Sequence, residues 1–316
     1  MENITFDDLL DHYFHVKLLR PATQWSYRKV VKSFIKDMKK QPWEVDSQTV
    51  LAWRREVLTG QRLEARTWNN KVAHMRAIFN FGINEGVLTH KKNPFNGVVV
   101  RAGKKKKKTL TKGQIEAIYL LMQQYYEQEQ QLAQSHRRSS KCALYPAWFW
   151  MTVLDMLRYT AIRQNQLQHI RVGDVNLEER WVDLRTEGAK NHCEHRVPVI
   201  RALYPRLHEL VTRSLEAGAE LTDPLFDVAR FDVRRRKSAM SIYPLRAFFR
   251  RLSKDCRFPV SPHRFRHTVA THMMKSPDRN IQAVKRLLGH VSIMSTMEYI
   301  DEDVDALREI LEQELM

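Results

Sequence analysis

The run of five lysines from Lys104 to Lys108 constrains the fold of this chain more than any other feature. Together with Arg101 it forms a segment, residues 101–108, that has six basic residues and no acidic one. Such a segment repels itself and has no apolar side chain to pack into a core. We therefore expect an extended basic linker at 101–108 between two domains, residues 1–100 and residues 109–316.

The net charge of the chain indicates a polyanionic partner. Lys and Arg number 53 against 36 Asp and Glu, which gives a formal net charge of +17 over 316 residues. Residues 1–108 hold 22 basic and 10 acidic residues, whereas residues 109–316 hold 31 and 26. A basic excess concentrated in this way is typical of proteins that bind nucleic acid.

The lysine run has two interpretations. In a linker that crosses DNA, its lysines would neutralise phosphates and release counterions. Alternatively, the run is a solvated loop without a specific partner. We predict contacts with the DNA backbone for the following residues: Lys104, Lys105, Lys106, Lys107 and Lys108.

The cysteines and the apolar runs indicate a cytoplasmic protein. Cys142, Cys193 and Cys256 are widely spaced and form no CxxC pair, so neither a disulfide framework nor a zinc site is expected. The most apolar run, Ala147 to Leu157, contains Asp155 and is too short to cross a bilayer. We expect no cofactor, no bound metal and no membrane segment.

Residues 1–100 show apolar positions at helical spacing throughout. Thr5 is placed to cap a first helix, and a second covers the region from Tyr27 to Met38. A third spans Ser47 to Leu58, and a fourth runs from about Ala65 to Glu85. The first domain is therefore expected to be a small helical bundle.

The second domain is expected to be helical apart from one hairpin. Helical periodicity runs from Ala147 to Thr160 and from Gln164 to Ile170, and it returns after Leu203. The segments Trp181 to Arg185 and Arg196 to Val199 are typical of strands and flank a polar turn. The predicted fold class is mainly α, with a helical first domain and a mixed α+β second domain that contains a small antiparallel hairpin or sheet.

Four cationic clusters of the second domain carry the candidate chemistry. Any one of their residues has an ordinary structural explanation, but their combination provides the parts for metal-free phosphoryl transfer. Arginines bind a phosphodiester through bidentate contacts, and a tyrosine can form a covalent phosphoester. The sequence has no nucleotide-binding or metal-binding motif beside them. The candidate residues are Arg163, Lys190, His263, Arg266, His290 and Tyr299.

The order of these clusters resembles the tyrosine recombinase (phage integrase) family. That family has a first arginine, a hairpin lysine, a His-x-x-Arg-His motif, a Leu-Gly-His motif and a final tyrosine. The run from Pro262 to Thr271 and the Leu288-Gly289-His290 motif before Tyr299 are highly specific in combination. The resemblance covers nearly the whole chain. It implies a helical core-binding domain at 1–100 and a catalytic domain at 109–316.

The resemblance implies a site-specific recombinase that cuts and rejoins double-stranded DNA through a 3′-phosphotyrosyl intermediate, in the integration or excision of a mobile element. Arg163 and Arg266 would hold the scissile phosphate while Tyr299 attacks it. An ordinary tyrosine has a pKa near 10 and needs help to lose its proton at neutral pH.

The remaining candidates have roles in proton transfer and positioning. His263 would accept the tyrosine proton, and His290 would position the phosphate by hydrogen bonding. Lys190 would protonate the departing 5′ oxygen. His267, which follows the second arginine, fits the family motif as a structural neighbour rather than as a catalyst.

Two positions depart from the family pattern. Ala161 stands where a glycine usually precedes the first arginine, and it is followed by Ile162. Gln166 stands where the family usually has an acidic residue, three positions after that arginine. We expect the second change to weaken a supporting contact without removing the phosphate ligand.

The last residues, 303–316, are expected to form an amphipathic helix. Such a helix either packs on its own domain or, as the resemblance implies, docks on a neighbouring protomer in a homotetramer on DNA. Host factors that bend the DNA are further candidate partners.

Two other functions use the same fold. A type IB topoisomerase shares the arginine clamp and the tyrosine but relaxes DNA as a monomer, and the small helical domain with the Leu-Gly-His motif favours a recombinase instead. A catalytically silent DNA-binding protein is the second alternative. The presence of all six candidate residues argues against it.

Overall fold

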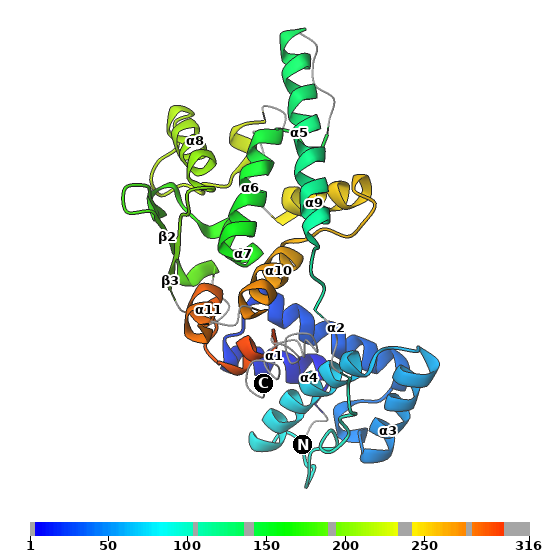
Figure 1. Cartoon of the computed structure of the whole chain (residues 1–316). Coiled ribbons are helices and arrows are strands. Elements are labelled where there is room, and N and C mark those ends of the chain that lie inside the picture. The colour runs from blue at the N-terminus through cyan, green and yellow to red at the C-terminus, as the bar shows by residue number, and fades with distance from the viewer. Residues whose placement is uncertain are drawn as a thin grey trace, which may run out of the picture. The chain divides into compact units, whose positions relative to one another are not determined.

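The computed structural model describes residues 4–103, 107–135, 142–188, 194–232, 242–275 and 280–299. The chain divides into two compact units, residues 1–105 and 106–316, and each is described by itself (Figure 1). Each unit has its own cluster of buried apolar side chains.

The first unit is built from helices. Its first helix begins with a capping box, in which the Thr5 hydroxyl accepts from the backbone of Asp8 and the Asp8 carboxylate accepts from the backbone of Thr5. The third helix continues into a π-helical turn at Glu56–Gly60. The α-helices are α1 (Phe6–Lys17), α2 (Pro21–Met38), α3 (Ser47–Arg55) and α4 (Ala65–Asn84).

Aromatic side chains fill the core of the first unit. The rings of Phe34 and Trp53 lie 5.0 Å apart edge to face, and those of Trp53 and Trp68 lie 5.2 Å apart. The indole Nε1 of Trp68 donates to the carbonyl oxygen of Val98 at 2.9 Å. This bond ties the segment that leads toward the lysine run to the helical core.

In its described residues, the second unit is helical apart from three short strands and short 3₁₀ turns. Its longest helix, α5, extends well beyond its neighbours (Figure 1). The α-helices are α5 (Lys112–Gln134), α6 (Ala147–Thr160), α7 (Gln164–His169), α8 (Tyr204–Glu216), α9 (Ile242–Asp255), α10 (Pro262–Lys275), α11 (Ile281–Leu288) and α12 (Met294–Met297).

Helix α6 forms the centre of the second unit. Nearly all of its side chains are buried, and it contacts α5, α8 and α10. The ring of Trp150 stacks on that of Phe248 in α9 with 4.3 Å between centroids. An apolar run that is buried on every side forms the core helix of a globular unit. Among the described residues, no helix is long and apolar enough to cross a membrane.

The sheet is antiparallel, in the order β1 (Val175–Asn176), β2 (Trp181–Leu184) and β3 (His195–Pro198). Leu184, the last residue of β2, pairs with His195, the first residue of β3. The prediction of a mainly helical chain with a small antiparallel sheet is confirmed. Strand β1 was not expected, because a two-residue strand is too short to show alternation.

Several expectations lie outside the described residues. They concern Lys104, Lys105, Lys106, Lys190, Cys193 and the helix expected at 303–316.

Candidate active site

Arg266 lies at the centre of the candidate site and is almost fully buried. It belongs to α10, and 4% of its surface is exposed. Its Nη1 donates to the carbonyl oxygen of Ala161 at 2.8 Å, and its Nη2 donates to that of Leu288 at 2.7 Å. These carbonyls terminate α6 and α11, where the helix dipole is negative. Two other helices therefore fix the guanidinium.

Arg163 lies in the turn that joins α6 to α7. Ala161 ends α6 in the left-handed conformation, with φ of 53°. Its carbonyl turns toward Arg266, and Arg163 follows two residues later as the N-cap of α7. The Nη1 of Arg163 lies 3.5 Å from the carbonyl oxygen of Gly289. An alanine thus adopts the backbone conformation for which the family usually has glycine.

The two arginines form a site for an anion. Burial lowers the pKa of Arg163. Burial and then the charge of Arg163 lower the pKa of Arg266 to about 10. Both guanidinium groups stay charged at neutral pH. Two nearby cations in a desolvated site favour a bound anion such as a phosphodiester.

His290 joins the arginine pair to the segment that carries the tyrosine. Its Nε2 lies 3.0 Å from Nη2 of Arg266, and its Nδ1 lies 3.0 Å from the hydroxyl oxygen of Thr296. Because a guanidinium only donates, Nε2 is the acceptor and Nδ1 carries the proton. Burial, followed by the charges of Arg266 and Arg163, lowers the pKa of His290 to about 4. The ring is therefore neutral at physiological pH.

Tyr299 is held inside the same cluster, with 6% of its surface exposed. Its hydroxyl oxygen lies 3.0 Å from Nδ1 of His267. Its ring is nearly parallel to that of His290, with 6.2 Å between centroids. Its backbone N–H donates to the carbonyl oxygen of Thr296 at the end of α12.

The hydroxyl partner of Tyr299 was not among the residues that we predicted to be catalytic. His267 was expected to be a structural neighbour, and His263 was expected to accept the tyrosine proton. The two imidazoles stack on the same side of α10, with 5.7 Å between centroids. The spacing of four residues was the signal that could have marked His267, since i and i+4 side chains share a helix face.

Lys107 is the second unexpected member of the cluster. Its ammonium lies 5.1 Å from the centroid of the Tyr299 ring and forms an ion pair with Glu298 at 2.6 Å. The contact of this lysine with the DNA backbone stays a prediction, and in the structure its ammonium is bound to an acidic residue of its own unit. Lys108 is exposed. No local sequence signal could have joined two residues 191 positions apart.

Gly289 brings the sheet against the site. It has a φ of 57° and ends α11. A Cβ at this position would lie 2.6 Å from Cε1 of His195, the first residue of β3. The imidazole therefore packs directly against the Leu-Gly-His motif. The end of the sheet at which β2 stops and β3 starts therefore lies at the site.

Gln166 supports the first arginine through the backbone. Its Oε1 accepts from the N–H of Arg163 at 2.9 Å. The side chain is buried, with 2% of its surface exposed, and its Nε2 has no hydrogen-bond partner among the described residues. The amide thus keeps the turn contact of a carboxylate but adds no negative charge beside the arginines.

The structure brings together five of the six residues that we predicted to be catalytic. Contacts around Arg266 and Tyr299 link them into one cluster, and Lys190 lies outside the described residues. The clustered candidates are Arg163, His263, Arg266, His290 and Tyr299. Within the described part of the chain, no group of His, Cys, Asp and Glu side chains is placed to hold a metal ion.

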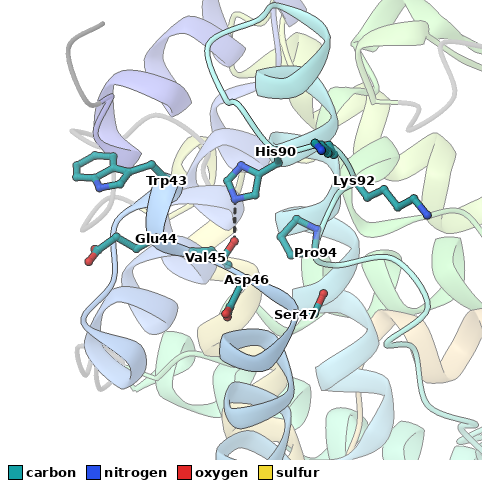
Figure 2. A pocket seen from close by; sticks show the side chains of 9 residues that line it. Trp43, Glu44, Val45, Asp46, Ser47, His90, Lys92 and Pro94 are labelled. Atoms are coloured by element: carbon teal, nitrogen blue, oxygen red, sulfur yellow. Dashed lines mark hydrogen bonds between the residues drawn. The ribbon is translucent and has the colours of Figure 1, made fainter.

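A separate pocket lies in the first unit, between the start of α3 and the segment that follows α4 (Figure 2). His90 lies above it, and its Nε2 donates to the carbonyl oxygen of Val45 at 2.7 Å. Glu44, Asp46 and Lys92 are among the lining residues, so charges of both signs meet there. The pocket contains none of the residues that we predicted to be catalytic.

Comparisons with known proteins agree with this geometry. The model of the phage integrase family matches residues 108–305. A Pseudomonas aeruginosa protein assigned to tyrosine recombinase XerC is 33% identical over 311 residues, which are 98% of this chain and 71% of that protein. A protein of the same assignment from Pseudomonas syringae is 31% identical over 99% of this chain and 65% of its own length.

Solved structures share the fold. The integrase of transposon Tn1549 bound to transposon right-end DNA has a TM-score of 0.73 at 18% identity, over 99% of this chain and all of that one. A lambda integrase tetramer bound to a Holliday junction has a TM-score of 0.62 at 17% identity, over 95% of this chain and 78% of that one. At these identities, the likeness concerns the fold alone.

Proposed function

This chain belongs to the phage integrase family of tyrosine recombinases, and from that premise we propose that it recombines double-stranded DNA at specific sites through a 3′-phosphotyrosyl intermediate. One observation carries the proposal. The Tyr299 hydroxyl is hydrogen-bonded to an imidazole, in a cluster that also holds two guanidinium groups. This arrangement supports the assignment of a nucleophile, a proton acceptor and an anion site to one cluster.

The arginines supply the electrostatic part of the mechanism. Arg163 and Arg266 would bind the non-bridging oxygens of the scissile phosphate and stabilise the charge that develops on them. Three of the five N–H groups of Arg266 make the bonds to Ala161, Leu288 and His290. A phosphate would use the others, or replace His290 as the partner of Nη2. A guanidinium fixed in advance needs little reorganisation when the phosphate arrives.

Proton transfer completes the proposed reaction. The Tyr299 oxygen attacks phosphorus, the bond from phosphorus to the 5′ oxygen breaks, and the tyrosine proton leaves toward the histidine pair His263 and His267. Lys190 would protonate the 5′ oxygen as it departs. The covalent bond stores the energy of the broken linkage, so rejoining needs no nucleotide.

The partners and setting form part of the proposal. The lambda integrase tetramer bound to a Holliday junction supports a homotetramer on DNA. The family resemblance implies that residues 303–316 dock on a neighbouring protomer in that assembly. DNA-bending host factors would assist, and integration or excision of a mobile element is the reaction we favour. A DNA substrate and widely spaced cysteines favour action in the cytoplasm. Residues 1–100 would form the core-binding domain, and residues 109–316 would form the catalytic domain. The basic linker at 101–108 would join the two.

The test uses a DNA duplex nicked close to the cleavage site, which traps the covalent complex because the released fragment diffuses away. We expect the wild-type protein to form an adduct on denaturing gels and Tyr299→Phe to bind DNA without forming one. Tyr126→Phe removes a hydroxyl elsewhere in the same unit and should leave the adduct intact. An adduct with Tyr299→Phe would show that another residue is the nucleophile.

A further inference from the structure

The geometry points to His267 as the group that takes the proton of Tyr299 when the tyrosine oxygen attacks the scissile phosphate; this inference rests on the proposed function. The sequence favoured His263 for this role. His267 follows Arg266 directly in α10, so one turn of helix presents both the cation and the imidazole to the phenol. The contact that supports the inference is the 3.0 Å approach of Nδ1 to the hydroxyl oxygen.

The contact of the phenol identifies the group that can take its proton. The hydroxyl oxygen of Tyr299 and Nδ1 of His267 lie 3.0 Å apart, and the tautomer of the imidazole sets which of them donates. When the imidazole carries its proton on Nε2, Nδ1 is unprotonated and accepts from the phenol O–H. In this tautomer the phenol is arranged to pass its proton to His267.

The charge state of His267 suits a proton acceptor. Its pKa is lowered to about 4, first by burial and then by the charges of His263, Lys107, Arg266 and Arg264. These groups come from α10 itself and from the segment before α5, while Tyr299 approaches from the end of α12. A neutral imidazole has one unprotonated nitrogen, and it accepts a proton more readily as the phenol ionises beside it.

The step balances in bonds and protons. The O–H bond of Tyr299 breaks as its oxygen bonds to phosphorus, and the proton passes to Nδ1 of His267. The bond between phosphorus and the 5′ oxygen breaks, and that oxygen takes a proton from the general acid, which the proposed function places at Lys190. In the rejoining step the same imidazole returns its proton to the tyrosine.

The experiment measures single-turnover formation of the covalent adduct on the nicked duplex between pH 6 and pH 9. We expect the wild-type rate to show no rise from deprotonation of the base, because His267 is already neutral. For His267→Asn, whose amide occupies the position of Nδ1 without accepting a proton, we expect a loss on the order of 100-fold or more at pH 7. Its rate should then rise about tenfold per pH unit as the phenol ionises unaided.

A matched substitution on the stacked neighbour separates the two histidines. His263→Asn should lower the rate without creating the pH slope. If His263→Asn creates the slope and His267→Asn does not, the base is His263 and the inference is wrong. Thermal unfolding of both variants controls for folding, and His267→Gln provides a second variant if the first does not fold.

Two chemical probes distinguish proton acceptance from positioning. Fluorotyrosine at position 299 lowers the pKa of the phenol and should restore much of the rate of His267→Asn. A substrate with sulfur at the 5′ bridging position needs no proton on its leaving group and should not restore it. A loss that is equal at every pH and insensitive to fluorotyrosine would reduce His267 to a positioning residue. An adduct with Tyr299→Phe would overturn the proposed function itself.

Discussion

The two arginines in this site contact backbone carbonyl oxygens rather than acidic side chains. The carbonyl oxygens of Ala161 and Leu288 hold Arg266, and the contact of Arg163 is with the carbonyl oxygen of Gly289. Carbonyls at helix ends orient a guanidinium without neutralising it. The full positive charge therefore remains available for a phosphate.

The two arginines are expected to respond differently to replacement by lysine. Arg163→Lys and Arg266→Lys should each reduce adduct formation strongly, because an ammonium cannot reproduce a planar bidentate contact. Arg266→Lys should also destabilise the fold by on the order of 2 kcal/mol, since it loses charge-assisted bonds to buried carbonyls. Adduct assays and thermal unfolding measure the two effects. Normal cleavage by either variant would contradict its role as a clamp.

Gly289 offers a test of the contact between the sheet and the site. Gly289→Ala should destabilise the protein through strain at its positive φ, roughly 1 kcal/mol or more, and through the contact with His195. Gly218→Ala is a matched control, because Gly218 has a φ of 83° with open space around it. The difference in unfolding free energy between the two variants measures the contact. Equal losses would mean that the packing of His195 contributes nothing.

At the scale of elements, the site lies where four helices and a loop meet. The ends of α6 and α11 provide the carbonyls, α10 provides two imidazoles and a guanidinium, and α12 leads directly into Tyr299. The segment before α5 reaches the same place through Lys107. Lys107 of the basic run therefore lies beside the ring of Tyr299.

Within the lysine run, Lys107 is expected to act differently from the other four lysines. Neutralising Lys104, Lys105, Lys106 and Lys108 together should lower the slope of log K against log salt by at most about 3.6, at about 0.9 per phosphate contact. Lys107→Gln should change that slope little, because its ammonium is bound to Glu298, and should instead lower the adduct rate.

Equilibrium binding to specific and random duplexes at several salt concentrations tests this division. Because the four lysines would contact phosphates without reading bases, affinity should fall alike for both duplexes. An unchanged slope in the fourfold variant would identify the run as a solvated loop. A large slope change in Lys107→Gln would place that residue on DNA instead.

At the scale of the whole molecule, half-buried neutral histidines couple the site to the stability of the fold. The pKa values of His267 and His290 are lowered to about 4, mainly by burial, whereas an exposed histidine in the unfolded chain titrates near 6.5. Between these values the unfolded state binds more protons than the folded state. Stability should therefore fall as the pH drops from 7 toward 5.

Thermal unfolding across this pH range checks the expectation. The double variant His267→Asn, His290→Asn removes both titrating groups and should show a weaker fall in melting temperature than the wild-type protein. Carboxylates titrate at lower pH and contribute equally to both proteins. An identical pH dependence would show that neither imidazole is held neutral by the fold.

The sequence by itself determined the elements and the chemical inventory. The apolar run from Ala147 to Thr160 marks a core helix with the observed bounds. Strand β2 ends one residue before the strand expected, and β3 begins and ends one residue before it. The motif spacing identified the family before any contact was known. Local periodicity and short motifs suffice for these features because they depend on neighbouring residues.

Only the tertiary structure decided which side chains come into contact. His267 and Tyr299 are 32 positions apart, and Lys107 and Glu298 are 191 positions apart. Their contacts depend on how α10, α12 and the segment before α5 pack together, which no local pattern encodes. Both histidines of the His-x-x-Arg-His motif lie on one side of α10, so the motif alone does not decide which of them meets the tyrosine. A hydrogen bond forms only within about 3 Å, and the packing of the tyrosine segment brings His267 to that distance from the phenol.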